Sequence, residues 1–303
     1  MTKHFIVAGH RFAFTMDDGK ELWQRLTNYA PFETKVSDAE TVFSLEFVDS
    51  MEKMNKVPVY VEKPEEEDQP RIEIYRRADD NGKPAEEVQW IIEMAPVQKM
   101  PICARLLASE DFSCGKLAVA SDRIADFAVN NAMMILYAFT TATRGTLEMH
   151  SSVIKNGGKG YMFLGKSGTG KSTHSNLWLK YIDGSVLLND DNPILRADED
   201  GVIRVYGSPW SGKTPCYKND CAPVGAIVRL NQFKENIITR SSIVEAYAAV
   251  YPSCSGFRAI RSIADGMHST IEKVAIGVPC FTLNCLPDEE AARVCHKAVT
   301  EAE

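Results

Sequence analysis

The sequence has no long hydrophobic run, and this absence excludes the simplest membrane arrangements. No segment approaches the roughly 18 consecutive apolar residues that a membrane-spanning helix requires. The apolar run after His4 ends at Gly9, which is too short for the core of a signal peptide. We therefore expect a cytoplasmic protein that makes no contact with a membrane.

Paired cysteine motifs are also absent. The eight cysteines are scattered along the chain, and none forms the C-x-x-C spacing that is typical of zinc and redox sites. Cys280 and Cys285 flank an apolar run, but no histidine lies near them at ligand spacing, which argues against zinc. We expect reduced cysteines that mostly serve as small buried side chains.

Positive charge is in short supply. The chain has 34 Lys and Arg against 41 Asp and Glu, so its net charge is −7. A general nucleic-acid-binding protein needs a clustered positive excess to meet phosphates, so we expect no nucleic-acid partner. A local basic pocket for a phosphorylated ligand stays compatible with this charge.

The chain nevertheless has enough apolar material for a sizeable core. Its 303 residues are 45% hydrophobic, which excludes disorder over the whole length and suggests about two domains. Residues 1–120 consist of short runs rich in β-branched and aromatic residues, separated by turn-forming and acidic stretches. This pattern predicts a strand-rich N-terminal α+β domain with an antiparallel sheet. The predicted strands are His4 to Phe14, Thr41 to Val48, Val57 to Val61, Arg71 to Tyr75, Glu87 to Met94, Cys103 to Ala108 and Lys116 to Ala120.

The hydrophobic period changes at Ser121. From there to Arg144, apolar residues recur at spacings of three and four, which predicts one long helix with Ser121 or Asp122 as its cap and Gly145 as its stop. This helix is apolar over most of its circumference. We therefore treat residues 121–145 as a connecting helix that is buried between two layers.

The third segment, residues 146–303, alternates strands with helices and contains a phosphate-binding motif. Gly165 to Ser172 reads G-K-S-G-T-G-K-S and fits the P-loop pattern, with a short apolar strand before it and an amphipathic segment after it. Glycines let backbone N–H groups converge on an anion, and the helix N-terminus adds partial positive charge. The predicted nucleotide-binding residues are Gly165, Lys166, Ser167, Gly168, Thr169, Gly170, Lys171, Ser172 and Thr173.

Two acids and a histidine accompany the motif. Asp190 and Asp191 follow an apolar strand downstream of it, where one carboxylate can hold Mg²⁺ and the other can accept the proton of an attacking hydroxyl. The alternative is a simple turn, since Asn and Asp favour turns. His150 precedes the P-loop strand, and taken alone it is as compatible with a structural histidine.

These three elements together resemble the core of the HPr kinase and phosphoenolpyruvate (PEP) carboxykinase superfamily. In that superfamily a histidine-containing strand, a Ser-Gly-x-Gly-Lys-[Ser/Thr] P-loop and an Asp-Asp doublet follow each other at similar spacings. Here they are Met149 to Ser152, Phe163 to Ser175 and Asn189 to Asp191. The resemblance covers about Leu147 to Lys213, and it implies an α/β P-loop nucleotide-binding domain over residues 146–303.

The resemblance also implies roles for single residues. Lys171 would bind the β- and γ-phosphates, and Ser172 with Asp191 would hold the metal. Asp190 would be the catalytic base or its neighbour, although the two aspartates can exchange roles. His150 would line the catalytic cleft. Lys213 and Arg258, in stretches that differ from those of HPr kinases, are candidates for contacts with the acceptor or the γ-phosphate, and each is equally compatible with an ordinary surface residue.

The leading hypothesis is therefore an HPr-kinase-like, ATP-dependent kinase that transfers the γ-phosphate to a serine-type hydroxyl of a protein or small molecule. Its cofactors would be ATP and Mg²⁺, with Mn²⁺ as the alternative metal. One alternative is a nucleotide-binding regulator or slow NTPase without an acceptor. The other, a PEP carboxykinase-like phosphotransferase, is less favoured because carboxykinases are much longer. The sequence names no acceptor, and it leaves open whether the protein forms a homo-oligomer as the related kinases do.

Overall fold

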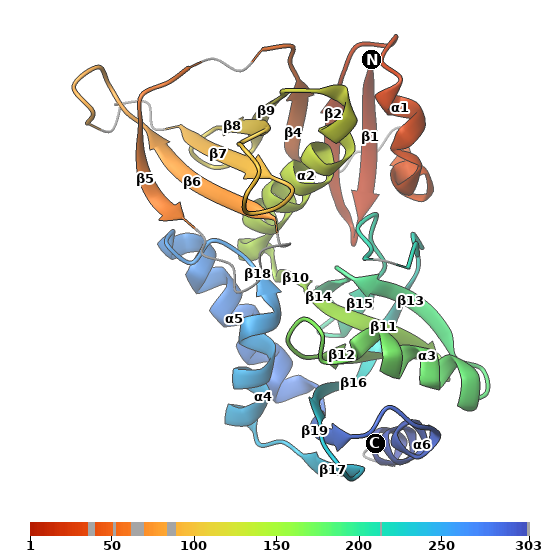
Figure 1. The fold of residues 1–303 in the computed structure, drawn as a ribbon. Coiled ribbons are helices and arrows are strands. Elements are labelled where there is room, and N and C mark those ends of the chain that lie inside the picture. Colours follow the sequence, from red (N-terminus) through yellow and green to blue (C-terminus); the bar gives the residue numbers. More distant parts are fainter. Residues whose placement is uncertain (36–39, 51–52, 62–69, 84–88, 213, 302–303) are drawn as a thin grey trace. The chain divides into compact units, whose positions relative to one another are not determined.

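The computed structural model describes residues 1–35, 40–50, 53–61, 70–83, 89–212 and 214–301 (Figure 1). The chain divides into two compact units, Met1–Thr141 and Ala142–Glu303. Each unit contains one large mixed sheet, and helices are few by comparison. The architecture is therefore mixed α/β.

The first unit is built on a nine-stranded sheet with the order β3-β1-β2-β4-β9-β8-β7-β6-β5. The expectation of an antiparallel sheet is wrong in its middle, because β4 runs parallel to both of its neighbours, β2 and β9. The acidic stretch 65–68 and the start of the strand predicted from Glu87 lie outside the described residues. The strands are β1 Thr2–Val7, β2 His10–Thr15, β3 Glu33–Thr34, β4 Thr41–Phe47, β5 Lys56–Val61, β6 Arg71–Arg77, β7 Trp90–Ala95, β8 Ala104–Ala108 and β9 Cys114–Val119.

The strand predicted from His4 to Phe14 is a hairpin instead. Its two strands, β1 and β2, pair antiparallel, and the chain reverses at Ala8 and Gly9. Both turn residues have positive φ angles, 47° and 78°, as a tight two-residue hairpin turn requires. A short helix, α1 (Leu22–Arg25), follows the hairpin.

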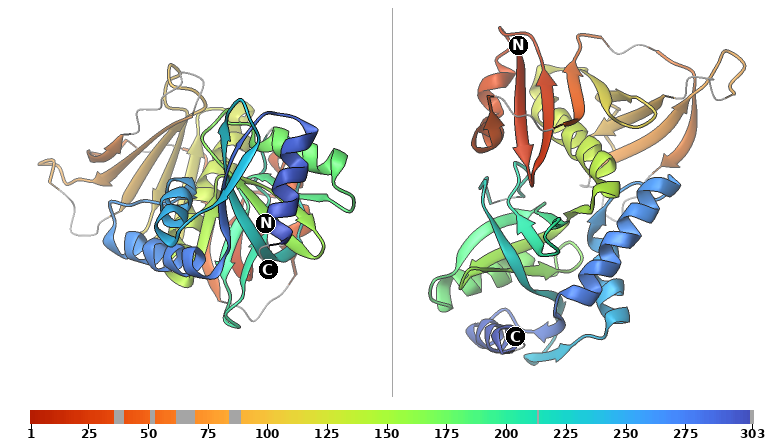
Figure 2. Two further views of the ribbon diagram at one scale, coloured as in Figure 1. Left: turned by 90° about the horizontal axis from the view of Figure 1, so that it is seen from below. Right: turned by 180° about the vertical axis from the view of Figure 1, so that it is seen from behind.

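The predicted long helix is present. A 3₁₀ turn at Asp122–Ile124 leads into α2 (Ala125–Thr141), and the Ser121 side chain accepts a hydrogen bond from the backbone N–H of Arg123 as the predicted cap. Gly145, the predicted stop, has a φ of 70°. The helix belongs to the first unit, where it packs against β4, β8 and β9 (Figures 1 and 2).

The contact between α2 and the sheet depends on one close approach. A Cβ atom at Gly115 of β9 would lie 2.9 Å from the Cδ1 atom of Leu136 in α2. Leu136 itself is fully buried. The glycine thus provides the space that this leucine fills.

We expect Leu136→Ala to destabilise the protein by about 2–5 kcal/mol, because it removes buried methyl groups and leaves a cavity over the sheet. The measurement is the urea midpoint of unfolding, followed by circular dichroism. Met100→Ala is the matched control, since this side chain is 42% exposed and its loss should shift the midpoint very little. Equal midpoints for Leu136→Ala and the wild type would contradict this packing.

The second unit is built on a larger sheet with the order β13-β11-β12-β16-β15-β14-β10-β18. In addition, β19 pairs with β16, and β17 pairs with the other edge of β19. The pairs β12–β16 and β16–β19 are parallel, and the other pairs are antiparallel. The strands are β10 Thr146–Met149, β11 Ser151–Asn156, β12 Lys159–Leu164, β13 Val186–Asp191, β14 Ile194–Ala197, β15 Ile203–Tyr206, β16 Cys221–Gln232, β17 Ile237–Arg240, β18 Cys254–Ser255 and β19 Cys280–Cys285.

The α-helices described beside this sheet are α3 (Lys171–Tyr181), α4 (Ile243–Val250), α5 (Arg261–Gly277) and α6 (Glu289–Thr300). Helices α3 and α6 pack together and enclose a core with Tyr161, Phe163 and Trp178 (Figure 1). Helices α4 and α5 pack together, and α5 lies against β10 and β14 (Figure 2). This core fixes β12 and α3, and therefore the loop between them.

Candidate functional site

The motif residues form a tight loop between β12 and α3. Gly168 and Gly170 have φ angles of 74° and 105°, which non-glycine residues rarely adopt. Gly170 is the N-cap of α3, and no side chain caps this helix end. The loop therefore presents backbone N–H groups and a helix N-terminus, which together favour an anion.

Lys171 points back into this loop. Its side chain is largely buried, and Nζ donates hydrogen bonds to the carbonyl oxygens of Gly165 (3.0 Å) and Lys166 (3.4 Å). Burial lowers the pKa of Lys171, although Asp191 and Asp190 act in the opposite direction. The ammonium group is thus held next to the loop by backbone oxygens.

The aspartate doublet lies at the end of β13, which pairs with β11. The Ser172 hydroxyl donates a hydrogen bond of 2.9 Å to Oδ1 of Asp190, and Asp190 is only 5% exposed. Asp190 is thereby joined to the first turn of α3, directly after the loop Gly165 to Gly170.

Asp191 is joined to the loop through His150. Its Oδ1 lies 2.9 Å from Nδ1 of His150, and Nε2 of the same ring lies 2.9 Å from Nζ of Lys171. An ammonium group can only donate, so Nε2 accepts and the ring proton is on Nδ1, which donates to Asp191. The three side chains form a hydrogen-bonded chain from Lys171 through His150 to Asp191.

The backbone of Asp191 is strained. Its φ of 137° is unusual for a residue with a Cβ atom, and such conformations cost about 1–3 kcal/mol. Strain of this kind persists only where surrounding contacts impose it, and it is concentrated at functional sites.

The structure describes only one of the two residues predicted to contact the acceptor or the γ-phosphate. Lys213 lies outside the described residues. Arg258 donates from Nη2 to the carbonyl oxygens of Tyr251 (2.9 Å) and Cys254 (3.1 Å), and its guanidinium lies over the Tyr251 ring. These contacts hold Arg258 on its own segment, so a contact with the acceptor or the γ-phosphate stays a prediction.

Two side chains near the motif are packed rather than exposed. Trp210, three residues before Lys213, is 2% exposed. His174 accepts a hydrogen bond from Nε1 of Trp178, lies edge-on to Phe163, and has its pKa lowered to about 4 by burial. Both therefore belong to the interior of the second unit.

Sequence reasoning missed Glu148, two residues before His150 on β10. Glu148 is 1% exposed, and among the described residues neither of its carboxyl oxygens has a hydrogen-bond partner. Burial, with a smaller contribution from Asp191, raises its pKa to about 8. The available signal in the sequence was a single acid between the apolar residues Leu147 and Met149, two positions before His150 and therefore on the same face of an extended chain.

Glu148 makes stability pH-dependent, with a defined sign. Below about pH 4.5 the carboxyl is protonated in both states, but above it the unfolded chain ionises while the folded chain does not. Stability should then fall by about 1.4 kcal/mol per pH unit up to about pH 8. We expect Glu148→Gln to remove this loss, so its advantage over the wild type grows with pH.

The measurement is urea unfolding of both proteins at pH 5, 6, 7 and 8, without metal or nucleotide. Glu46→Gln, at an exposed acid of the first unit, is the matched control and should track the wild type. A stability difference between Glu148→Gln and the wild type that stays constant with pH would show that Glu148 ionises normally.

The oxygen donors of the site fit a hard cation. Ser172 Oγ and Asp190 Oδ1 lie 2.9 Å apart beside the loop between β12 and α3, and Mg²⁺ binds few protein oxygens while retaining water and phosphate ligands. Across the described ranges, no group of three or more His, Cys, Asp or Glu residues is arranged to hold a metal by itself. A metal here would therefore depend on phosphate oxygens for much of its coordination.

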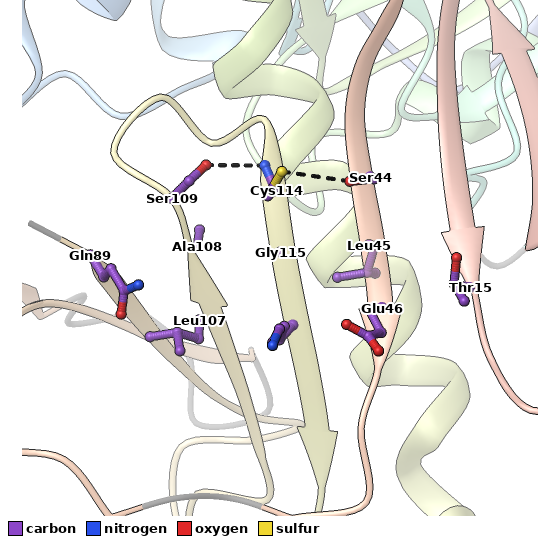
Figure 3. Close-up of a pocket in the computed structure, with 11 residues that line it drawn as sticks. Thr15, Ser44, Leu45, Glu46, Gln89, Leu107, Ala108, Ser109, Cys114 and Gly115 are labelled. Atoms are coloured by element: carbon purple, nitrogen blue, oxygen red, sulfur yellow. Dashed lines mark hydrogen bonds between the residues drawn. The ribbon is translucent and has the colours of Figure 1, made fainter. Parts of the chain in front are cut away.

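A separate cavity of about 440 Å³ opens on the sheet of the first unit (Figure 3). Its lining includes Ser44 of β4 and Cys114 of β9, whose Oγ and Sγ atoms lie 3.7 Å apart. Among the described residues, none of the nucleotide-binding, metal-binding or catalytic residues predicted from the sequence lines this cavity, so it forms no part of the candidate site.

Comparison with known proteins assigns no class to this chain. No family model matches it, and no curated protein matches it in sequence. Among the described residues, no helix is long and apolar enough to cross a membrane.

Proposed function

We propose that the second unit binds ATP with Mg²⁺ and transfers the γ-phosphate to a serine-type hydroxyl, as an HPr-kinase-like P-loop kinase. The observation that carries the proposal is the convergence of three strand ends and one helix end. His150 follows β10, the P-loop follows β12, the aspartate doublet ends β13, and Ser172 lies at the start of α3. Hydrogen bonds join Lys171 to His150, His150 to Asp191, and Ser172 to Asp190. A loop that merely turned from strand to helix would need no such set of bonds.

Lys171 and the loop N–H groups would bind the triphosphate. The Lys171 ammonium would exchange its bonds to Gly165 and Lys166 for charge-assisted bonds to phosphate oxygens, which are the stronger type. Bound Mg²⁺ would neutralise charge on the phosphates, held by Ser172 and Asp190.

The contacts favour roles for the two aspartates that are the reverse of those implied by the family resemblance. Asp190 is bonded to Ser172, which is the position that holds the metal in P-loop enzymes. Oδ1 of Asp191 accepts from Nδ1 of His150, and Oδ2 accepts from Nδ2 of Asn192 at 3.1 Å, so both oxygens of the carboxylate are held in place. Oδ2 keeps a second lone pair, which could accept the proton of an attacking hydroxyl. We therefore propose Asp191 as the base and Asp190 as the metal ligand.

The test is ADP release from Mg²⁺·ATP with water alone, free serine, a serine-containing peptide or oxaloacetate. Turnover that requires a hydroxyl acceptor supports the kinase. Nucleotide binding with acceptor-free turnover, or with none, supports the regulator or slow NTPase. Dependence on oxaloacetate would assign the carboxykinase-like reaction instead.

A further inference from the structure

The segment Gly207 to Gly212 lies directly on the aspartate doublet. Ser211 forms an isolated β-bridge with Asp191, and the backbone N–H of Gly212 donates 2.6 Å to the carbonyl oxygen of Asp190. The single proton of the Ser211 hydroxyl lies within reach of this oxygen, at 3.1 Å, and of the carbonyl oxygen of Thr214, at 2.6 Å. The backbone of the doublet is therefore fixed from the side opposite to β11.

The segment is also bonded to the residues on both sides of the doublet. Asn189 Nδ2 donates to the hydroxyl of Ser208 (3.2 Å) and to the carbonyl oxygen of Trp210 (3.1 Å). The Ser208 hydroxyl donates 2.5 Å to the carbonyl oxygen of Asn192. Because Asn189, Ser208 and Trp210 are almost fully buried, these bonds are shielded from water.

The Asp191 side chain is closely packed on the side that faces Gly212. A Cβ atom at Gly212 would lie 3.1 Å from Cβ and 3.3 Å from Cγ of Asp191, and 3.2 Å from the carbonyl oxygen of Asp190. At the other end, a Cβ atom at Gly207 would lie 2.0 Å from the carbonyl oxygen of Lys218. Close backbone approach thus requires a glycine at position 207. A Cβ atom at position 212 would make the Asp191 side chain or the Asp190 carbonyl oxygen move by a few tenths of an ångström.

We infer that Ser208 to Gly212 is a positioning element that holds Asp191 in its strained conformation and sets the carboxylates of the doublet for metal and acceptor. The inference rests on the proposed function, because it assigns the segment a role in that site. The bridge, the Gly212 contact and the buried bonds of Ser208 supply the constraints that the φ of 137° at Asp191 requires. The segment acts on the reaction only through the two aspartates.

The test variant is Gly212→Ala, whose methyl group must displace the Asp191 side chain or the segment by a few tenths of an ångström or more. We expect ATP affinity without Mg²⁺ to stay at the wild-type value, because the P-loop is untouched. The strengthening of ATP binding by Mg²⁺ should fall at least fivefold, and ADP release should slow by about 10²-fold, the usual effect of a misplaced reacting group. Calorimetry with and without Mg²⁺ gives the first two quantities.

Gly19→Ala is the matched control, since no atom lies within 4 Å of a Cβ atom at this site in the first unit. Two variants at Ser211 test the same inference without changing Gly212. Ser211→Ala should weaken the Mg²⁺ effect, and Ser211→Thr, which retains the hydroxyl, should restore it.

The outcomes separate the two proposals. A wild type that does not bind ATP overturns the proposed function and this inference with it. A wild type whose ATP binding responds to Mg²⁺, together with a Gly212→Ala variant and a Ser211→Ala variant that respond equally well, overturns only the positioning role.

Discussion

Asp191→Asn is expected to slow phosphoryl transfer by about 10²–10⁴-fold while leaving the affinity for Mg²⁺·ATP near the wild-type value. General-base catalysis contributes rate enhancements of this size, and an amide in place of the carboxylate accepts no proton from the acceptor. The substitution preserves the shape of the side chain and an oxygen that His150 can still bond at Nδ1. The effect should therefore appear in kcat rather than in nucleotide binding.

Asp190→Asn is the matched comparison, because it makes the same chemical change at the neighbouring residue. It should mainly raise the Mg²⁺ concentration needed for turnover, since Asp190 is bonded to Ser172. A Mg²⁺ titration of ADP release for both variants gives rate and metal dependence together. If the two patterns are exchanged, the aspartates have the roles first suggested by the family resemblance. If neither variant differs from the wild type, the doublet is only a turn.

Lys171→Ala is expected to weaken ATP binding by about 10–100-fold and to remove measurable turnover. The substitution removes a charge-assisted contact with the β- and γ-phosphates, a type of bond that contributes about 1.5–3 kcal/mol. The measurement is isothermal titration calorimetry with ATP and Mg²⁺.

Lys180→Ala is the control for this variant, because Lys180 is an exposed lysine in the last turn of the same helix. It changes the net charge equally and should leave ATP affinity at the wild-type value. Equal affinities for Lys171→Ala and the wild type would remove the P-loop assignment.

The parts of the fold that depend on local sequence were predictable. The loop that contains the motif lies between a strand and a helix because its glycines and the flanking apolar residues specify that turn locally. Ser121 caps the helix that leads to Gly145 for the same reason. The parallel placement of β4 was not predictable, because strand order in a sheet depends on pairs that are distant in sequence.

Helix α5 was not predicted as a separate element from the sequence, for a different reason. Its buried residues Ile263, Met267, Ile271 and Val274 do recur at helical spacing, but Gly266 interrupts the pattern. A Cβ atom at Gly266 would lie 2.6 Å from the carbonyl oxygen of Ala142, so this glycine serves a close backbone approach and does not end the helix.

The sequence predicted which residues form the candidate site, but not which hydrogen bonds join them. His150, Lys171, Ser172 and the aspartates are residue types with recognisable spacing. Which aspartate meets Ser172 depends on the β11–β13 register and on the unusual φ of Asp191, neither of which has a local sequence signal.

The measurement that tests the account most directly is a crystal structure of the protein with a non-hydrolysable ATP analogue and Mg²⁺. The account predicts the triphosphate within the loop Gly165 to Ser172, with Lys171 Nζ moved from the Gly165 carbonyl oxygen to a phosphate oxygen. It also predicts a metal between Ser172 and Asp190, and an Asp191 carboxylate that faces the open side of the γ-phosphate. Two results at saturating analogue would contradict the assignment of a nucleotide site. One is an analogue bound elsewhere, and the other is a Lys171 side chain that keeps its bonds to the Gly165 and Lys166 carbonyl oxygens.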